Sequence, residues 1–370
     1  MTDADKKIVD ALTSLTESGN GAEVLAALAA AFPDSVLYAV DHAFNSLVPI
    51  GEADRRAIPL KGGLYETVAA AESHEDAESR WTPLPDGRFP LFVLRQDRVA
   101  EPIEPWLSAI LGIILGHQLD VAESLESPRR RSDMTVAAHL QWSQVRSRAE
   151  RFGRFEVAGT LEPAYEVAGD MFDFALNPAG LLTIFSLDAM GHGQTATLSA
   201  ALALAAIRNS RLGGADLAEQ TAAADAALVA EWGGDRFTTI VGVEVHDDAL
   251  LVVNAGHEPM RMIGGDGVSA LALQADPPAG VGSGAQYRLQ ELPSMKPGDT
   301  LIMVSDGVSD ARNNEGTVFG PDRIIESLSD YRDLDPLPMV HRFVQDLLTH
   351  SPDHGDDITA VAVRRAPSDA

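Results

Sequence analysis

The second half of the chain alternates between apolar runs of strand length and short polar turns. Leu181 to Leu187 is a continuous apolar run, which is typical of a strand buried on both faces. Thr238 to Val245 and Ala249 to Val253 lie on either side of His246-Asp247-Asp248, and this arrangement predicts a hairpin. Two later runs predict further strands, Thr300 to Val304 and Ile358 to Val363.

A long helical pattern interrupts these strands. Gln194 to Leu212 is rich in alanine and ends at Gly213-Gly214, a pair that stops helices. Many strands combined with a few long helices predict an α+β domain from about Gly153 onward. In such a domain we expect packed β-sheets covered by helices.

Residues Ala4 to about Leu125 have a different pattern, which predicts a small α/β unit. Val24 to Phe32 has helical periodicity, while Ser35 to Val40 and Phe89 to Arg95 resemble strands. A helix from Ile103 to about Glu126 closes this unit.

The segment Ser127 to Asp133 breaks the pattern and indicates a boundary. Ser132 or Asp133 would cap a following helix that carries Val136, Leu140, Trp142 and Val145. The predicted organisation is a first domain at 1–126, a helical linker at 127–152 and a second domain at 153–366.

The composition fits a folded protein, because the chain has 370 residues of which 45% are hydrophobic. Lys and Arg total 28 against 55 Asp and Glu, a formal net charge of -27. Nucleic acids and anionic membranes recruit basic patches, so this balance argues against both as main partners. It suits a protein that collects cations around an acidic cleft. The sequence has no cysteine, which excludes disulfides, thiolate zinc sites and a cysteine nucleophile.

Neither end of the first domain resembles a targeting or membrane segment. Met1 to Lys7 lacks the basic start and apolar core of a signal peptide. The most apolar helical stretch, Ile103 to Leu119, contains Glu104, Pro105 and His117 and is short for a membrane span. We therefore expect a cytoplasmic protein.

Four short motifs place an aspartate where a strand-like run meets a turn: Gly169–Asp173, Asp188–Gly193, Ser305–Gly307 and Gly355–Thr359. If these motifs converge, their carboxylates would repel one another unless cations lay among them. Mg²⁺ and Mn²⁺ prefer such oxygen ligands, and two ions about 3.5–4 Å apart would activate a bridging water to attack phosphorus. The predicted catalytic and ligand residues are Asp170, Asp188, Asp306 and Asp356. Asp188 is the candidate for the bridging ligand, and the turn Ala189-Met190-Gly191 would direct a backbone carbonyl toward a metal.

Each motif also has a structural reading without chemistry. A lone Asp-Gly is usually a turn, and Asp247 and Asp248 are assigned no other role. Asp173 and Asp310 are either groups that support the metals or solvent-facing turn residues. His192 and His257 would donate a proton or, as the favoured reading, anchor their loops.

Taken together and in this order, the motifs resemble the metal-dependent protein phosphatase superfamily of type 2C serine/threonine phosphatases. The bacterial SpoIIE/RsbU-like branch is the closer match, over about Gly153 to Arg364. The resemblance rests on five segments: Ala168–Asp173, Asp188–Gly193, Asn254–His257 with Pro259, Asp306–Gly307 and Asp356–Thr359. Ala168, Ala189-Met190 and Ser305 depart from the common pattern, but none of these changes removes a carboxylate.

The resemblance implies a catalytic domain of two packed antiparallel β-sheets flanked by helices, with two Mn²⁺ or Mg²⁺ ions as cofactor. It implies the ligand set Asp170, Asp188, Ala189 through its carbonyl, Asp306 and Asp356. It also implies a substrate, phosphoserine or phosphothreonine on an anti-anti-sigma factor-like protein, and thus a role in sigma factor regulation. Met190 occupies the position of a proposed general acid in eukaryotic relatives, so the proton donor stays unassigned.

The first domain resembles a GAF-type sensory domain, and a homodimer through this domain and the linker helix is a further expectation. A catalytically silent binding module is the alternative to a phosphatase. A cation-binding protein without phosphatase activity ranks last, because the aspartates are too dispersed for an EF-hand loop.

Overall fold

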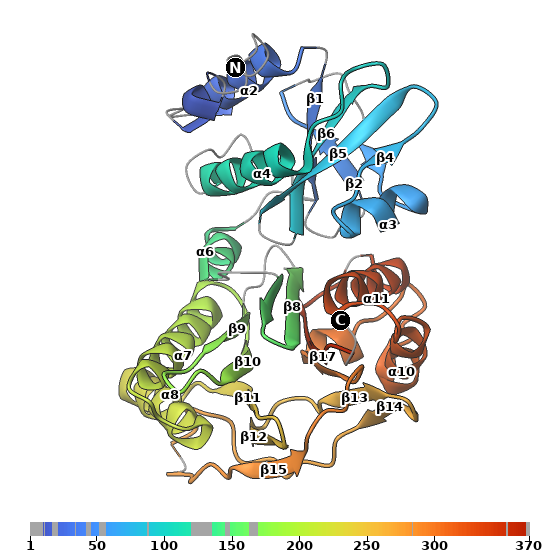
Figure 1. The fold of residues 1–370 in the computed structure, drawn as a ribbon. Coiled ribbons are helices and arrows are strands. Elements are labelled where there is room, and N and C mark those ends of the chain that lie inside the picture. Colours follow the sequence, from blue (N-terminus) through green and yellow to red (C-terminus); the bar gives the residue numbers. More distant parts are fainter. Residues whose placement is uncertain are drawn as a thin grey trace. The chain divides into compact units, whose positions relative to one another are not determined.

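The structure is a computed structural model that describes residues 10, 12–16, 21–33, 35–41, 46–51, 57–86, 89–119, 135–144, 149–162, 169–282, 284–352 and 354–367. It divides into two compact units, Met1–Asp133 and Met134–Ala370 (Figure 1). The predicted break at Ser127 to Asp133 and residues 120–126 of the predicted helix before it lie outside the described residues.

The first unit contains one six-stranded antiparallel sheet in the order β3-β2-β1-β6-β5-β4. Helices α2 and α4 pack on one face of this sheet through a cluster of buried apolar side chains. Gly112 lets α4 approach β5, since a Cβ there would lie 2.0 Å from the Pro85 carbonyl oxygen. The elements are α2 (Gly21–Ala31), β1 (Val36–Val40), β2 (Ser46–Pro49), β3 (Ile58–Pro59), α3 (Gly63–Ala69), β4 (His74–Glu75), β5 (Ser79–Asp86), β6 (Phe89–Asp97) and α4 (Pro105–Leu119).

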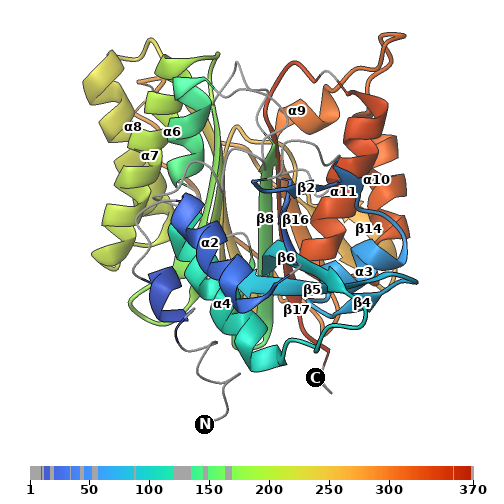
Figure 2. The same cartoon turned by 90° about the horizontal axis from the view of Figure 1, so that it is seen from above.

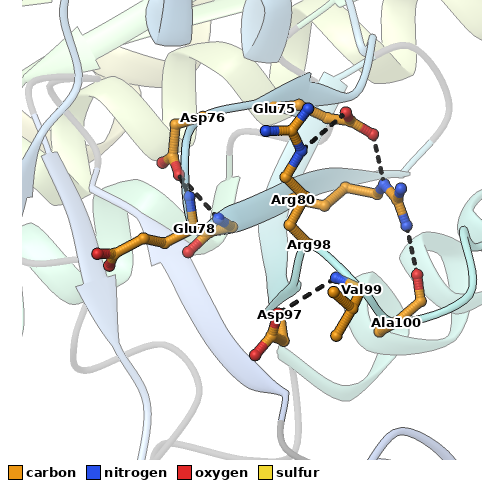
Figure 3. Close-up of polar contacts among 9 residues, drawn as sticks. Glu75, Asp76, Glu78, Arg80, Asp97, Arg98, Val99 and Ala100 are labelled. Atoms are coloured by element: carbon orange, nitrogen blue, oxygen red, sulfur yellow. Dashed lines mark hydrogen bonds and ion pairs between the residues drawn. The ribbon is translucent and has the colours of Figure 1, made fainter.

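The turn between β4 and β5 is held by charged side chains (Figure 3). Asp76 accepts hydrogen bonds from the backbone N–H groups of Glu78 and Ser79, at 2.9 and 2.8 Å. Arg80 forms a 2.8 Å ion pair with Glu75 and donates to the Ala100 carbonyl at 2.7 Å. These contacts join β4 and the start of β5 to the segment after β6, so they are structural.

The second unit contains two antiparallel sheets, as the sequence predicts. One has five strands in the order β15-β12-β11-β10-β9, and the other has six in the order β14-β13-β16-β17-β8-β7. The strands are β7 (Ala149–Phe152), β8 (Phe155–Glu162), β9 (Asp170–Leu176), β10 (Leu182–Ala189), β11 (Thr238–Val245), β12 (Ala249–Ala255), β13 (Arg261–Gly264), β14 (Gly267–Ala270), β15 (Gln290–Pro293), β16 (Thr300–Val304) and β17 (Ile358–Arg365). The helices are α6 (Val136–Gln144), α7 (Gln194–Leu212), α8 (Leu217–Trp232), α9 (Asp306–Ser309), α10 (Gly320–Asp330) and α11 (Pro336–His350).

The two sheets pack face to face, and helices cover their outer faces (Figure 2). Side chains from both sheets form the central core, and α7 and α8 pack on the outer face of the five-stranded sheet. Helix α11 contacts β8 and β17 of the other sheet. Gly159 permits close approach of the sheets, because a Cβ there would lie 2.5 Å from the ring of Phe172. The predicted α+β architecture of packed antiparallel sheets flanked by helices is therefore confirmed.

Strand β10 explains the continuous apolar run in the sequence. Successive side chains of a strand point to opposite faces. Ile184 accordingly enters the core between the sheets, while Phe185 and Leu187 pack beneath the helices. Both faces of the strand are thus buried, as predicted.

Helix α6 belongs to the second unit, where it contacts α7 and β9. It covers part of the predicted linker, whereas Val145 lies outside the described residues. In the described part of the chain, no helix has the length and apolar character needed to cross a membrane.

Candidate metal centre

Asp170 and Asp188 are brought together by the pairing of β9 and β10. Asp170 is the first residue of β9 and lies opposite Asp188, the penultimate residue of β10. By strand alternation Asp170 shares the face of Phe172, and Asp188 shares the face of Ile184. Both of those residues belong to the core between the sheets. The two carboxylates therefore lie on the inner face, at the edge of the sandwich.

The other sheet supplies Asp306 and Asp356 at the same edge. Strand β16 ends at Val304 and pairs antiparallel with β17, which begins at Ile358. The end of one strand and the start of the other are therefore neighbours, and Asp306 and Asp356 flank them. The structure thus brings Asp170, Asp188, Asp306 and Asp356 together, and we call these four residues the acidic cluster.

The electrostatics of Asp188 agree with this arrangement. Burial, followed by the charges of Asp306 and Asp356, raises the pKa of Asp188 to about 8. Asp188 and Asp306 also share a side-chain hydrogen bond, which raises the pKa of Asp188 further. Asp188 lies on one sheet, and its pKa is therefore raised by carboxylates at the edge of the other sheet.

Asp170 and Asp356 are perturbed in the same direction. Burial, then the charges of Asp188 and Asp357, raises the pKa of Asp170 well above its usual range. Burial and the charge of Asp306 raise the pKa of Asp356 to about 6, against the hydrogen bond that its Oδ1 accepts from the Asp357 N–H. In the absence of a cation, these three carboxyl groups therefore keep their protons to a higher pH than an ordinary aspartate does.

The donor chemistry of the acidic cluster fits hard divalent cations, which neutralise clustered carboxylates. Oδ2 of Asp170 is buried and has no hydrogen-bond partner among the described residues. Within the same part of the chain, no three carboxylate or imidazole side chains already stand in an arrangement that could hold a metal. The unpaired Asp170 Oδ2 is an oxygen donor available to such a cation.

Asp357, to which the sequence pattern assigned no role, anchors this edge. Its buried Oδ2 accepts hydrogen bonds from the Gly169 N–H at 2.8 Å and the Asp170 N–H at 3.2 Å. Gln141 of α6 donates to the same oxygen at 2.7 Å and to the Asp170 carbonyl at 2.6 Å. Asp357 thus fixes the start of β9 and links it to α6. The sequence signal for this role was the pair Asp356-Asp357 before β17. By strand alternation Asp357 shares the face of Val361, which belongs to the core between the sheets.

Two motif glycines are required by close backbone approach. A Cβ on Gly307 would lie 2.0 Å from the Asp357 carbonyl oxygen. A Cβ on Gly169 would lie 2.8 Å from the carbonyl oxygen of Ala189, the predicted backbone ligand. Ser305 joins the same region, donating to the Asp357 carbonyl at 3.3 Å and accepting from the Thr359 N–H at 3.0 Å.

Asp173 does not join the acidic cluster. It is three residues after Asp170, so it points to the opposite face of β9. There Arg208 and Arg211 of α7 contact it at 2.8 and 2.7 Å. Asp173 is buried, so the reading of this residue as a metal-supporting or turn group is wrong. Asp310 is exposed. It lies near the acidic cluster, since its charge is one of the causes that raise the pKa of Asp356.

The two candidate histidines differ. His257 is buried, and its Nδ1 hydrogen-bonds the Thr239 hydroxyl at 2.8 Å. Asn254 Oδ1 accepts from the His257 N–H at 2.8 Å, which fits the favoured loop-anchoring role. Burial lowers the pKa of His257 to about 4, so its imidazole is neutral at pH 7 and is not a charged proton donor. His192 is exposed in the loop after Asp188.

Comparisons with known proteins show what this chain is similar to. The chain is 26% identical to the SiaA-PP2C domain of Pseudomonas aeruginosa, with a TM-score of 0.49 over 56% of this chain and 84% of that one. A structure of the RsbU and RsbW domains of Rv1364c from Mycobacterium tuberculosis is similar in fold, with 18% identity and a TM-score of 0.51. That match covers 58% of this chain and 62% of the other.

Among curated proteins, Protein IcfG of Synechocystis sp. (strain ATCC 27184 / PCC 6803 / Kazusa) is 29% identical over 125 residues, 33% of this chain. The match spans only 19% of the length of that relative. The family model of Stage II sporulation protein E (SpoIIE) matches residues 178–366, slightly more than half of the chain. This region includes Asp188, Asp306 and Asp356 and begins after Asp170. The predicted family is confirmed: the chain belongs to the SpoIIE family, whose model matches within the second unit.

Proposed function

We propose that this protein is a metal-dependent serine/threonine protein phosphatase. The observation that carries the proposal is the convergence of the acidic cluster from two sheets, with the pKa of Asp188 raised to about 8 by burial and by its neighbours. A scaffold has no chemical need to pack like charges in this way. Family membership supports the same activity.

The chain's own residues have distinct parts in this proposal. Asp170, Asp188, Asp306, Asp356 and the Ala189 carbonyl would hold two Mn²⁺ or Mg²⁺ ions. Such ions, when bound, supply a water of lowered pKa that attacks phosphorus. Asp188 would bridge them, because it faces Asp170 within its sheet and interacts with Asp306 across the sandwich. Asp357 and Gln141 would hold the start of β9 in register.

The proposal extends to the partner and to the first unit. The substrate would be phosphoserine or phosphothreonine on an anti-anti-sigma factor-like protein in the cytoplasm, as the motif resemblance implies. The first unit would be a GAF-like sensory domain that contributes to a homodimer with the linker helix. Its six-stranded antiparallel sheet with helices packed on one face is compatible with that role.

Hydrolysis of p-nitrophenyl phosphate tests the activity. Purified protein should release p-nitrophenol with Mn²⁺ or Mg²⁺ but not with EDTA, and Asp188→Asn should abolish this release. Asp247→Asn is the matched control, because Asp247 is an exposed hairpin residue paired with Arg154. Absence of turnover with both metals, on this substrate and on a phosphoserine peptide, would refute the proposed function.

A further inference from the structure

Arg236 lies at the same edge of the five-stranded sheet as the acidic cluster. Strand β11 pairs with β10 so that Thr239 is opposite Asp188 and Thr238 is opposite Ala189. Arg236 comes just before this pairing begins. The Met190 N–H donates to the neighbouring Phe237 carbonyl at 3.0 Å, which continues the pairing beyond the ladder. Arg236 is therefore beside the loop that follows Asp188.

The guanidinium of Arg236 reaches back over that loop. Its Nη1 donates to the Met190 carbonyl at 3.4 Å and lies 3.7 Å from the position of a Cβ on Gly191. A hydrogen bond of this length is weak. A guanidinium carries five N–H donors, so this one contact orients the group and leaves donors for a ligand.

Arg236 also differs from the arginines that stabilise the fold. Arg208 and Arg211 contact Asp173 within 3 Å and are largely buried. Across the described residues, Arg236 has no carboxylate within ion-pair distance, and its side chain is partly exposed. A cation that is positioned at an acidic edge but left unneutralised has charge available for an anion.

We propose that Arg236 binds the phosphoryl oxygens of the substrate at the rim of the acidic cluster. This inference rests on the proposed function and adds to it the residue that recognises the phosphate group. A chain with a formal net charge of -27 repels a phosphoester, and a guanidinium fork that matches two phosphate oxygens offsets this repulsion locally. The interaction exists in the bound ground state as well as during reaction, so it contributes to substrate binding.

The test compares Arg236→Ala and Arg236→Lys with the unmodified protein in Mn²⁺. Loss of a charge-assisted hydrogen bond should raise the KM for p-nitrophenyl phosphate and the inhibition constant of inorganic phosphate by roughly 10- to 100-fold. The value of kcat should change by about twofold or less, since uniform binding affects KM alone. Arg236→Lys should recover part of the loss. Arg154→Ala is the control, because it removes an exposed ion pair with Asp247, which follows the far end of β11 from Arg236.

Calorimetric binding of inorganic phosphate to the Mn²⁺-treated protein separates this inference from the proposed function. If the unmodified protein has no turnover, the activity fails, but a phosphate affinity lost in Arg236→Ala still supports the assignment. Equal phosphate affinity in the unmodified protein and in Arg236→Ala overturns it. A fall in kcat at unchanged KM also overturns it, because that result would indicate displacement of the Asp188 loop.

Discussion

Asp170 and Asp188 form a cross-strand pair of two carboxylates on β9 and β10. Like charges directly opposite each other destabilise a sheet. Burial adds to the cost, because it raises the pKa of both groups. The edge that carries the proposed chemistry is therefore under electrostatic strain when these carboxyl groups are ionised and cations are absent. This strain should be measurable in the stability of the metal-free protein.

Asp188→Asn should raise the Tm of the protein in EDTA at pH 8. The amide removes a half-buried negative charge that Asp306 and Asp356 repel, and it keeps the shape of the side chain. Each kcal/mol gained corresponds to roughly 2–4 °C for a domain of this size. Thermal unfolding followed by circular dichroism measures the effect.

Asp173→Asn is the informative counterpart, since Asp173 lies on the opposite face of the same sheet. Its removal leaves Arg208 and Arg211 without their buried anion, and breaking such a pair costs about 3–5 kcal/mol. Its Tm should therefore fall. A lowered Tm for Asp188→Asn in EDTA would contradict the strain at the acidic cluster.

The stability of the metal-free protein should decline between about pH 6.5 and pH 8. Asp188 has a pKa raised from 3.8 to about 8, so the folded state binds more protons than the unfolded state and loses stability as pH rises through this range. His257 has the opposite effect on stability, because its pKa is lowered from 6.5 to about 4 and stability therefore rises with pH between these values. Above pH 6.5 this contribution no longer changes, so the decline due to Asp188 is seen alone. Urea unfolding in EDTA at several pH values checks this slope. Added Mn²⁺ should flatten it, and a flat slope in EDTA would argue against a raised pKa for Asp188.

Gly307→Ala should disrupt the site more than Gly355→Ala. A Cβ on Gly307 would lie 2.0 Å from the Asp357 carbonyl oxygen, so the turn before β17 would have to move. Gly355 has open space around its Cβ position and lies in the same acidic turn. Mn²⁺ affinity from calorimetry and Tm should both fall for Gly307→Ala only. Similar values for the two variants would show that the close approach is not required.

Gln141→Ala should weaken Mn²⁺ binding through Asp357. The variant removes the donor that contacts both the Asp357 carboxylate and the Asp170 carbonyl. Loss of a partner that orients metal ligands typically costs roughly 10- to 100-fold in metal affinity. Val136→Ala is the control, because Val136 is 74% exposed on the same helix. Unchanged Mn²⁺ affinity in Gln141→Ala would limit the role of Gln141 to packing of α6.

The elements of the second unit were largely predictable because their signals are local. The alanine-rich pattern and Gly213-Gly214 placed a helix at Gln194 to Leu212, which coincides with α7. The apolar run Leu181 to Leu187 overlaps β10, and the predicted hairpin around Asp247 joins β11 and β12. Periodicity and turn chemistry act within a few residues, so they can be read along the chain.

The sequence by itself determined these elements and which aspartates stand at strand ends. Only the tertiary structure decided what each aspartate contacts. It paired Asp173 with arginines 35 and 38 positions later and placed Asp357 against Gly169, 188 residues away. It also brought Gln141 to the edge where both sheets end. Such contacts depend on which strands pair and which faces pack. Pairing and packing are set by contacts between residues distant in sequence, so a local pattern does not contain them.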